Sequence, residues 1–257
     1  MYIDYSTSNG VAFITLNRPE KFNSFIREMS LELQAALKKA NEDASVRAVL
    51  LHGTGKAFCA GQDLSEAIDP SGPGITRIVE EHYNPIIRLM RNLEKPVIAA
   101  VNGVAAGAGA NIALAADLIV AGKSATFIQA FSKIGLIPDS GGTFFLPRLI
   151  GLQRAAALMF TAEKVGAEEA RDMGMIYKVY DDEELLRHAT ALAEQLAQLP
   201  TRGLWLTKKL LNASMTNSLD EQLRLEGEVQ TEAGATEDHR EGVKAFLEKR
   251  KPIFYGR

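Results

Sequence analysis

The sequence predicts an α/β protein with a largely parallel sheet, followed by a C-terminal group of helices. Over the first 180 residues, short apolar segments typical of buried strands alternate with segments whose apolar residues recur at helical spacing. Beyond Pro200 only the helical pattern continues. Because strands joined through helices run parallel, the loops that follow them meet at one edge of the sheet, where α/β proteins bind their ligands.

The first half of the chain alternates strands and helices. Residues 2–6 and 11–16 are expected to form a β-hairpin around an Asn-Gly turn, residues 25–40 an amphipathic helix, residues 46–53 a buried strand and residues 75–93 a second helix. This order predicts a strand-helix-strand unit next to the hairpin.

The second half begins with a strand at residues 97–101. Short strands or extended pieces are expected at 117–122, 125–129 and 133–138, and helices at 141–160, 166–173, 202–215, 219–232 and 239–250. The last three helices are rich in charge, and no strand pattern separates them. We therefore expect a core at residues 1–199 that contains the functional site, and a helical appendage at residues 200–257.

Composition limits the classes of function. The 29 Lys and Arg residues against 32 Asp and Glu give a net charge of −3, so the chain lacks the basic field that nucleic-acid binding needs. Glycines and polar residues interrupt every apolar segment, which argues against a membrane span. The N-terminus has no signal-peptide pattern, and the only cysteine is Cys59. We expect a cytoplasmic protein that acts on a small molecule and holds no metal.

Two glycine-rich loops are expected to expose backbone N–H groups. Residues 53–66, GTGKAFCAGQDLSE, follow a strand but lack the Walker A spacing. Residues 102–117, NGVAAGAGANIALAAD, place Gly107 and Gly109 at the start of a helix, where free N–H groups and the helix dipole favour an anion. Ile112 breaks the dinucleotide-binding spacing. Each loop alone is compatible with tight packing, whereas one N–H group from each could form an oxyanion hole.

A third loop, GLIPDSGGT at residues 135–143, contains a carboxylate at Asp139. An aspartate before a helix commonly caps the first turn, and Pro-Asp-Ser-Gly is also ordinary turn chemistry. The alternative is an acid/base group. Its position after an apolar run predicts partial burial, which raises the pKa of a carboxyl when no cation is near.

Together, several segments resemble the enoyl-CoA hydratase/isomerase (crotonase) superfamily over essentially the whole chain. They are LNRPEKFNSF, FCAGQDL, VNGVAAGAGANIALAAD, GLIPDSGGT and EGVKAFLEKRKP. The resemblance implies a β-β-α spiral core, assembly into trimers or hexamers, and acyl-CoA thioesters as substrates. It also implies that the backbone N–H groups of Gln62 and Ala108 form the oxyanion hole.

The resemblance assigns further residues to contacts with the CoA thioester. They are Lys21, Ala60, Asp63, Leu64, Gly107, Phe131, Phe246 and Lys249. In the family pattern Lys21 approaches the CoA phosphates, and Phe246 and Lys249 reach a bound CoA from the appendage, including the appendage of a neighbouring subunit.

Two departures from the family pattern bear on the reaction. Hydratases of the family have two glutamates at positions where this chain has Asn111 and Phe131. Neither side chain can ionise to orient water and move its proton, so hydration is disfavoured and Asp139 becomes the single acid/base. We expect no cofactor, because the thioester and the oxyanion hole accept the developing charge.

Within the family, HYNPIIRLM and AFSKIGLIPDSGGT are most similar to isomerases of phenylacetate breakdown that convert ring-1,2-epoxyphenylacetyl-CoA to oxepin-CoA. The same groups would also shift a cis-3 double bond to trans-2. A hydratase, and a dehalogenase-like enzyme in which Asp139 is a nucleophile, stay open as alternatives. A non-enzymatic RNA or protein binder has only the basic stretch at 248–251 in its favour.

Overall fold

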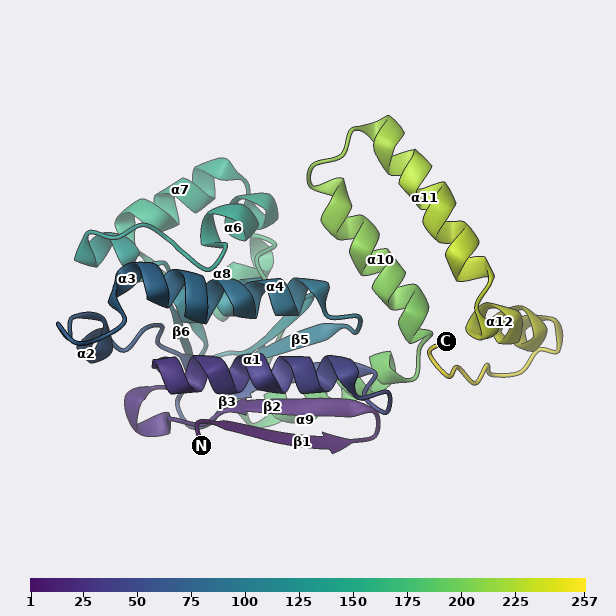
Figure 1. Ribbon diagram of the computed structural model, residues 1–257, viewed down its shortest axis with the longest axis horizontal. Helices are drawn as coiled ribbons and strands as arrows, with labels where there is room; N and C mark the ends of the chain where they lie inside the picture. The colour runs from purple at the N-terminus through teal and green to yellow at the C-terminus, as the bar shows by residue number, and fades with distance from the viewer.

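The computed structural model describes residues 1–257 and contains two β-sheets surrounded by helices (Figure 1). The larger sheet has the order β1-β2-β3-β5-β7-β10 and the smaller one β4-β6-β8-β9. The larger sheet consists of β1 Ile3–Ser8, β2 Val11–Leu16, β3 Ala48–Gly53, β5 Val97–Val101, β7 Leu118–Gly122 and β10 Lys178–Tyr180. The smaller sheet consists of β4 Ala57–Cys59, β6 Val104–Ala106, β8 Thr126–Ile128 and β9 Lys164–Gly166.

Helices cover both sheets and form the C-terminal end of the molecule. Those of the core are α1 Arg27–Glu42, α2 Leu64–Ala67, α3 Gly74–Arg77, α4 Asn84–Asn92, α5 Ala108–Leu114, α6 Gly142–Ile150, α7 Leu152–Thr161, α8 Ala167–Asp172 and α9 Asp182–Ala197. Shorter turns are the 3₁₀ segments η1 Pro19–Lys21 and η3 Ala130–Ile134 and the π-helical segment η2 Ile78–Tyr83. The appendage consists of α10 Thr201–Ser214, α11 Leu219–Gly234 and α12 Glu237–Leu247.

A repeated β-β-α unit connects the two sheets. β3, β5 and β7 are parallel neighbours in the larger sheet, and each is followed directly by β4, β6 or β8, which are parallel neighbours in the smaller one. Helical segments then return the chain from β4 to β5 and from β6 to β7; after β8 the chain first adds β9 to the smaller sheet and then reaches β10 through α8. The predicted α/β class and the β-β-α spiral are therefore confirmed, and the carboxyl ends of β4 and β6 lie side by side.

The hairpin and the first helices agree with the sequence. Asn9 and Gly10 both have positive φ, 50° and 77°, as the tight turn between β1 and β2 requires. The helix expected at 75–93 is present as α3, η2 and α4 in succession. Its π-helical middle has no signal in the sequence pattern.

Two expectations were wrong in detail. The short strand or extended piece expected at residues 133–138 is not a strand: η3 continues to Ile134, and Ile137 is 81% exposed. A short apolar run has the same pattern whether it is a buried strand or an exposed loop, so periodicity could not separate them. The single helix expected at 141–160 is divided into α6 and α7 at Gly151, whose φ is 82°.

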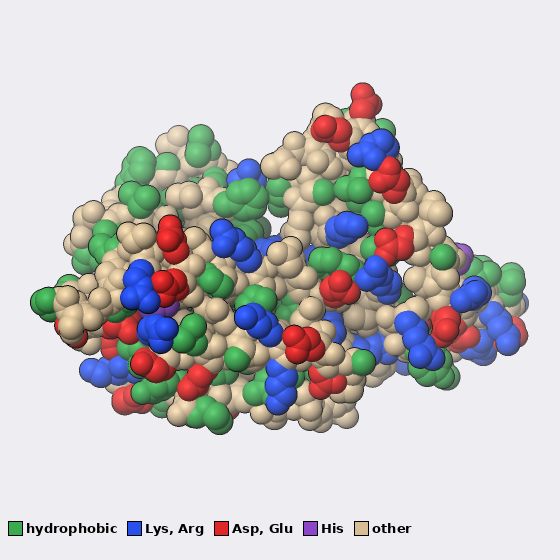
Figure 2. Space-filling model, in the orientation of Figure 1, with side chains coloured by type: hydrophobic (Ala, Val, Ile, Leu, Met, Phe, Trp, Pro, Cys, Tyr) green, Lys and Arg blue, Asp and Glu red, His purple; other side chains and the backbone are tan.

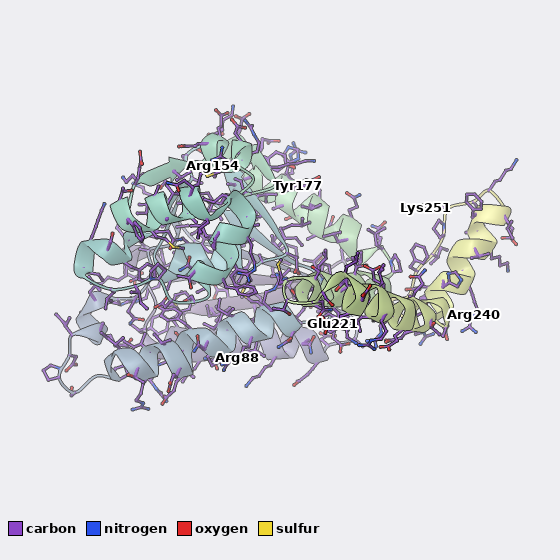
Figure 3. The ribbon with its side chains drawn as sticks, turned by 90° about the horizontal axis from the view of Figure 1, so that it is seen from above. Arg88, Arg154, Tyr177, Glu221, Arg240 and Lys251 are labelled. Carbon is purple, nitrogen blue, oxygen red and sulfur yellow. The ribbon has the colours of Figure 1, made fainter.

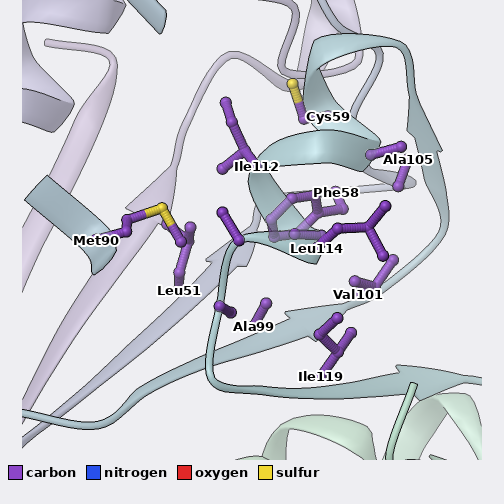
Figure 4. Close-up of a cluster of buried hydrophobic side chains, with 14 of the residues drawn as sticks. Leu51, Phe58, Cys59, Met90, Ala99, Val101, Ala105, Ile112, Leu114 and Ile119 are labelled. Carbon is purple, nitrogen blue, oxygen red and sulfur yellow. The ribbon is translucent and has the colours of Figure 1, made fainter. Parts of the chain in front are cut away.

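The hydrophobic core anchors α5, the helix that follows the second glycine loop. Figure 4 shows Ile112 and Leu114 of α5 among Phe58, Val101 and Ile119, and all of these side chains are buried. The helix start therefore has a fixed position relative to both sheets.

On the opposite face of the larger sheet lies α9, which the sequence analysis missed. Its buried residues are Leu185, Ala189, Ala193 and Ala197, which pack against Val11, Leu50, Ile98 and Val120. Their spacing of four residues is the helical signal that could have revealed it.

The appendage projects away from the core (Figures 1 and 3). Lys208 of α10 is buried and lies 2.8 Å from Asp117, which also pairs with Arg91 at 3.1 Å. A cleft of about 660 Å³ separates α4 and α6 from α10, and Figure 2 shows this face hollowed there. The division of the chain at residues 199–200 stays a prediction. No helix is both long and apolar enough to span a bilayer.

The buried ion pair provides a test of how firmly the appendage is attached. Lys208→Ala should lower the free energy of unfolding by about 3 kcal/mol, because Asp117 loses a partner and the carbonyl of Met90 loses a donor. Lys209→Ala on the same helix is the matched control, since Lys209 is exposed, and it should change stability by less than about 0.5 kcal/mol. Urea unfolding of both variants measures the difference. Equal free energies of unfolding in the two variants would contradict a stabilising role for the ion pair of Lys208 and Asp117.

Candidate active site

The first glycine loop is held against the segment that follows β2. The N–H of Phe25 donates to the carbonyl of Gly61 at 2.7 Å, and the N–H of Asp63 donates to the carbonyl of Phe25 at 2.9 Å. Asn23 is fully buried, and its amide donates to carbonyls on either side of the start of β4. These bonds place η1, with the exposed side chain of Lys21, beside the loop.

The two glycine loops meet at very short distances. A Cβ on Gly61, whose φ is 93°, would lie 2.9 Å from the carbonyl oxygen of Ala106 and 3.5 Å from the nitrogen of Ala108. A Cβ on Gly109 would lie 2.3 Å from the carbonyl oxygen of Cys59. Only glycine permits this approach, and it brings the peptides of Gln62 and Ala108 to one junction.

The N–H groups at this junction are available to a ligand. Ala108 is the first residue of α5, so its N–H has no acceptor within the helix. The N–H of Gln62 donates to no backbone carbonyl. Two free donors from neighbouring loops are the arrangement that an oxyanion hole requires. Their role in binding a thioester stays a prediction.

The side chain of Gln62 is fixed at both ends. Its Oε1 accepts a hydrogen bond from the hydroxyl of Tyr83 at 2.8 Å, and its Nε2 donates to Glu66 at 2.7 Å. Tyr83 is the last residue of η2 and is fully buried; desolvation raises the pKa of its hydroxyl, as do the nearby Cys59 and Asp139. The sequence analysis missed Tyr83, because its position on the helix is that of an ordinary core aromatic.

Asp139 does not cap a helix. The residue that precedes α6 is Gly141, whose φ is 74°, and no side chain caps the first turn. The carboxyl of Asp139 is half-buried and accepts a hydrogen bond from the hydroxyl of Ser140 at 2.9 Å. Desolvation raises the pKa of this carboxyl, and no cation lies close enough to oppose the effect. The predicted partial burial and raised pKa are therefore confirmed.

The residues at the two positions where the family resemblance predicts glutamates in hydratases have different surroundings. Phe131 is buried, and the tip of its ring lies 3.7 Å from where a Cβ on Gly107 would be, so it forms an apolar wall beside the second loop. Asn111 is fully buried, and its amide donates to the backbone carbonyl of Asp139 at 2.9 Å. Neither residue adds an ionisable group to the site.

The remaining predicted contacts of the first loop have structural partners or are exposed. Asp63 caps α2 by accepting from the N–H of Ser65 and forms an ion pair with Arg18 at 2.8 Å. The hydroxyl of Ser65 also donates to this carboxylate, and that bond is the main cause of the lowered pKa of Asp63. Ala60 is half-buried, while Leu64 is 51% exposed.

Phe246 and Lys249 do not approach the site within one chain. Phe246 is 83% exposed on α12, and Figure 1 shows α12 at the opposite end of the molecule from α2. In the view from above, Arg240 and Lys251 lie at the end of the appendage far from Arg154 of α7 (Figure 3). Contact of Phe246 and Lys249 with the site of a neighbouring copy, and assembly into trimers or hexamers, stay predictions.

Comparison with known proteins identifies the family. The family model for Enoyl-CoA hydratase/isomerase matches residues 6–257. The chain belongs to this family. As a family member, it is 51% identical over 251 residues to the 1,2-epoxyphenylacetyl-CoA isomerase of Escherichia coli (strain K12), with 96% of each protein covered. It is 38% identical over 256 residues to the trans-2-decenoyl-[acyl-carrier-protein] isomerase of Streptococcus mutans, with 98% of this chain and 97% of the relative covered.

Solved structures of family members share the fold. An enoyl-CoA hydratase from Bacillus anthracis matches with a TM-score of 0.93 at 34% identity, with 100% of both chains covered. An enoyl-CoA hydratase from Mycobacterium smegmatis gives a TM-score of 0.93 at 30% identity, with 99% of both chains covered. Proteins with isomerase names and hydratase names thus share this fold, so the reaction must be inferred from the side chains in the site.

The close approach of the two loops leads to a kinetic prediction for this family member. Gly109→Ala should lower kcat for its acyl-CoA substrate about a hundredfold, because the new methyl group displaces one N–H donor relative to the other. Gly227→Ala is the control, since Gly227 also lies in a helix but has open space around it. Steady-state kinetics of both variants measures the effect. An unchanged kcat in Gly109→Ala would show that the junction does not serve catalysis.

Proposed function

We propose that this family member is an acyl-CoA isomerase in which Asp139 moves a proton while the N–H groups of Gln62 and Ala108 bind the thioester oxygen. The main support is the carboxyl of Asp139, which is half-buried and has a pKa raised by desolvation, while neither Asn111 nor Phe131, which the family resemblance compares with the hydratase glutamates, can ionise. The preferred substrate is ring-1,2-epoxyphenylacetyl-CoA, which is converted to oxepin-CoA. The 51% identity to an isomerase of 1,2-epoxyphenylacetyl-CoA supports this choice.

The proton transfers balance within the substrate. The carboxylate of Asp139 removes a proton from the carbon next to the thioester, and the electron pair moves into an enolate whose oxygen is bound by the two N–H groups. In the epoxide, the bond shared by the three- and six-membered rings opens to give the seven-membered oxepin. Asp139 then returns the proton to a conjugated ring carbon. Product and substrate are isomers, so the conversion consumes no water and needs no oxidant or reductant.

The same groups support a second activity, the shift of a cis-3 double bond to trans-2. Removal of a proton from C2 and its return to C4 need one base and the same oxyanion hole. The 38% identity to a trans-2-decenoyl-[acyl-carrier-protein] isomerase favours this second candidate. The apolar wall at Phe131 is compatible with either an aromatic ring or an alkenyl chain.

Replacement of the base tests the proposal directly. Asp139→Asn should lower kcat by about a thousandfold or more and abolish exchange of the substrate's α-proton with deuterated water, because an amide cannot accept the proton. At neutral pH the variant should melt at a higher temperature than the wild type, since it removes the cost of a half-buried charge. Turnover at the wild-type rate would overturn the proposal.

The pH dependence has a definite sign. Since burial raises the pKa of Asp139 above 3.8, kcat should fall as pH decreases through this raised pKa, while the base becomes protonated. Stability changes in the opposite direction: in that pH range the native state binds more protons than the unfolded state, so the contribution of Asp139 to stability decreases as pH rises. A pH series of kcat and of melting temperature measures both trends.

A panel of thioesters distinguishes the alternatives. We expect conversion of the epoxide to the oxepin and migration of cis-3 double bonds, with little hydration of crotonyl-CoA. Rapid hydration would contradict the isomerase proposal. Turnover in ¹⁸O-labelled water should leave the carboxyl of Asp139 unlabelled, whereas a nucleophilic role would transfer solvent oxygen into it.

A further inference from the structure

Two buried amide side chains connect the core to the peptide of Asp139. Nε2 of Gln129, just before η3, donates to Oδ1 of Asn111 at 2.8 Å, and Nδ2 of Asn111 donates to the carbonyl oxygen of Asp139 at 2.9 Å. Asn111 is fully buried and Gln129 is 5% exposed. The three residues come from separate segments of the chain, and these two hydrogen bonds connect one residue to the next.

The direction of these hydrogen bonds is fixed by their last acceptor. A backbone carbonyl can only accept, so Asn111 must present its NH₂ group to Asp139 and its oxygen to Gln129. Gln129 must then present its own NH₂ group. A substitution that replaces one of these donors by an acceptor therefore removes its hydrogen bond and the fixed orientation of both amides, even when the shape of the side chain is kept.

The turn that contains Asp139 needs such support. Ser140 and Gly141 both have positive φ, 50° and 74°, and this conformation costs energy at a serine. The carbonyl of Asp139 accepts one further hydrogen bond, from the N–H of Gly142 at 2.8 Å. A Cβ on Gly142 would lie 2.4 Å from Nδ2 of Asn111, so the amide fills the space beneath the start of α6.

We propose that Asn111 and Gln129 are positioning residues, which hold the peptide of Asp139 so that its carboxyl points at the substrate and stays partly shielded from water. The proposal rests on the proposed role of Asp139 as the base. In this proposal Asn111, which the family resemblance compares with the first hydratase glutamate, binds the backbone of Asp139 and does not contact the reacting atoms of the substrate.

Loss of the two hydrogen bonds of Asn111 should slow catalysis and leave substrate binding almost unchanged. Asn111→Leu, which keeps the size but removes both hydrogen bonds, should lower kcat about 30- to 100-fold and change KM less than twofold, because a small displacement of a catalytic group slows the chemical step. The acid limb of the kcat profile should move to lower pH, since a looser turn admits water to the carboxyl of Asp139.

A carboxyl group at position 111 gives a sharper test. A protonated carboxyl has the donor and acceptor order of an amide, whereas a carboxylate has only acceptors. Asn111→Asp should therefore be active just above the acid limb set by Asp139 and lose activity as pH rises further, which gives a descending limb that the wild type lacks. The other titratable groups around this position are Asp139, Cys59, Tyr83 and, near Gln129, Glu163; burial raises the pKa of Cys59 and Tyr83, and Glu163 is exposed.

The control variant is Asn212→Leu, which removes a half-buried amide from α10 and should keep kcat within twofold. If Asn111→Leu does not fold, Gln129→Leu decides by the same readouts, because it removes the donor to Oδ1 of Asn111. Wild-type kcat and an unshifted acid limb in either variant would overturn the proposal that Asn111 and Gln129 position Asp139. A higher KM with unchanged kcat would also overturn it, since Asn111 would then contact substrate. Retained activity in Asp139→Asn would instead refute the proposed function.

Discussion

The architecture of the site depends on the contact between two glycine loops at the ends of β4 and β6. The two strands are parallel neighbours in the smaller sheet, so their following loops emerge side by side. Contact at this range requires the absence of side chains at Gly61 and Gly109, where a Cβ would lie within 3 Å of a carbonyl oxygen of the facing loop. Since α5 begins at this junction and is anchored in the core, its first N–H cannot turn away. Rigid donors of this kind need no reorganisation when negative charge develops on a substrate.

α5 also connects the proposed oxyanion donors to the proposed base. Ala108 opens the helix, and Asn111, one turn later, binds the carbonyl of Asp139. One short helix thus sets the distance between the carboxyl of Asp139, which would accept a proton, and the N–H of Ala108, which would bind the thioester oxygen. Asn111 cannot ionise and holds a neighbouring peptide, which agrees with the isomerisation that we propose more than with hydration.

Features determined by neighbouring residues could be predicted from the sequence, whereas those determined by distant contacts could not. The Asn9-Gly10 hairpin, the amphipathic helix predicted at 25–40 and the glycine loops have local signals, and the structure contains them. Strands of three residues, such as β9 and β10, are too short to show a period. The stripe of Leu185, Ala189, Ala193 and Ala197 in α9 was visible but was overlooked. The bond of Asn111 to Gln129, 18 residues away, and the bond of Tyr83 to Gln62 exist only because of the tertiary fold.

The position of Cys59 has a practical consequence. Its sulfur lies directly beneath the junction, where a Cβ on Gly109 would be 2.7 Å away, and burial raises the pKa of the thiol to about 12. A thiol-modifying reagent can reach this sulfur only in molecules whose loops have separated. The rate at which Cys59 reacts therefore measures how often the junction opens. A thioester bound to both loops should lower this rate in proportion to the fraction of protein that has bound it.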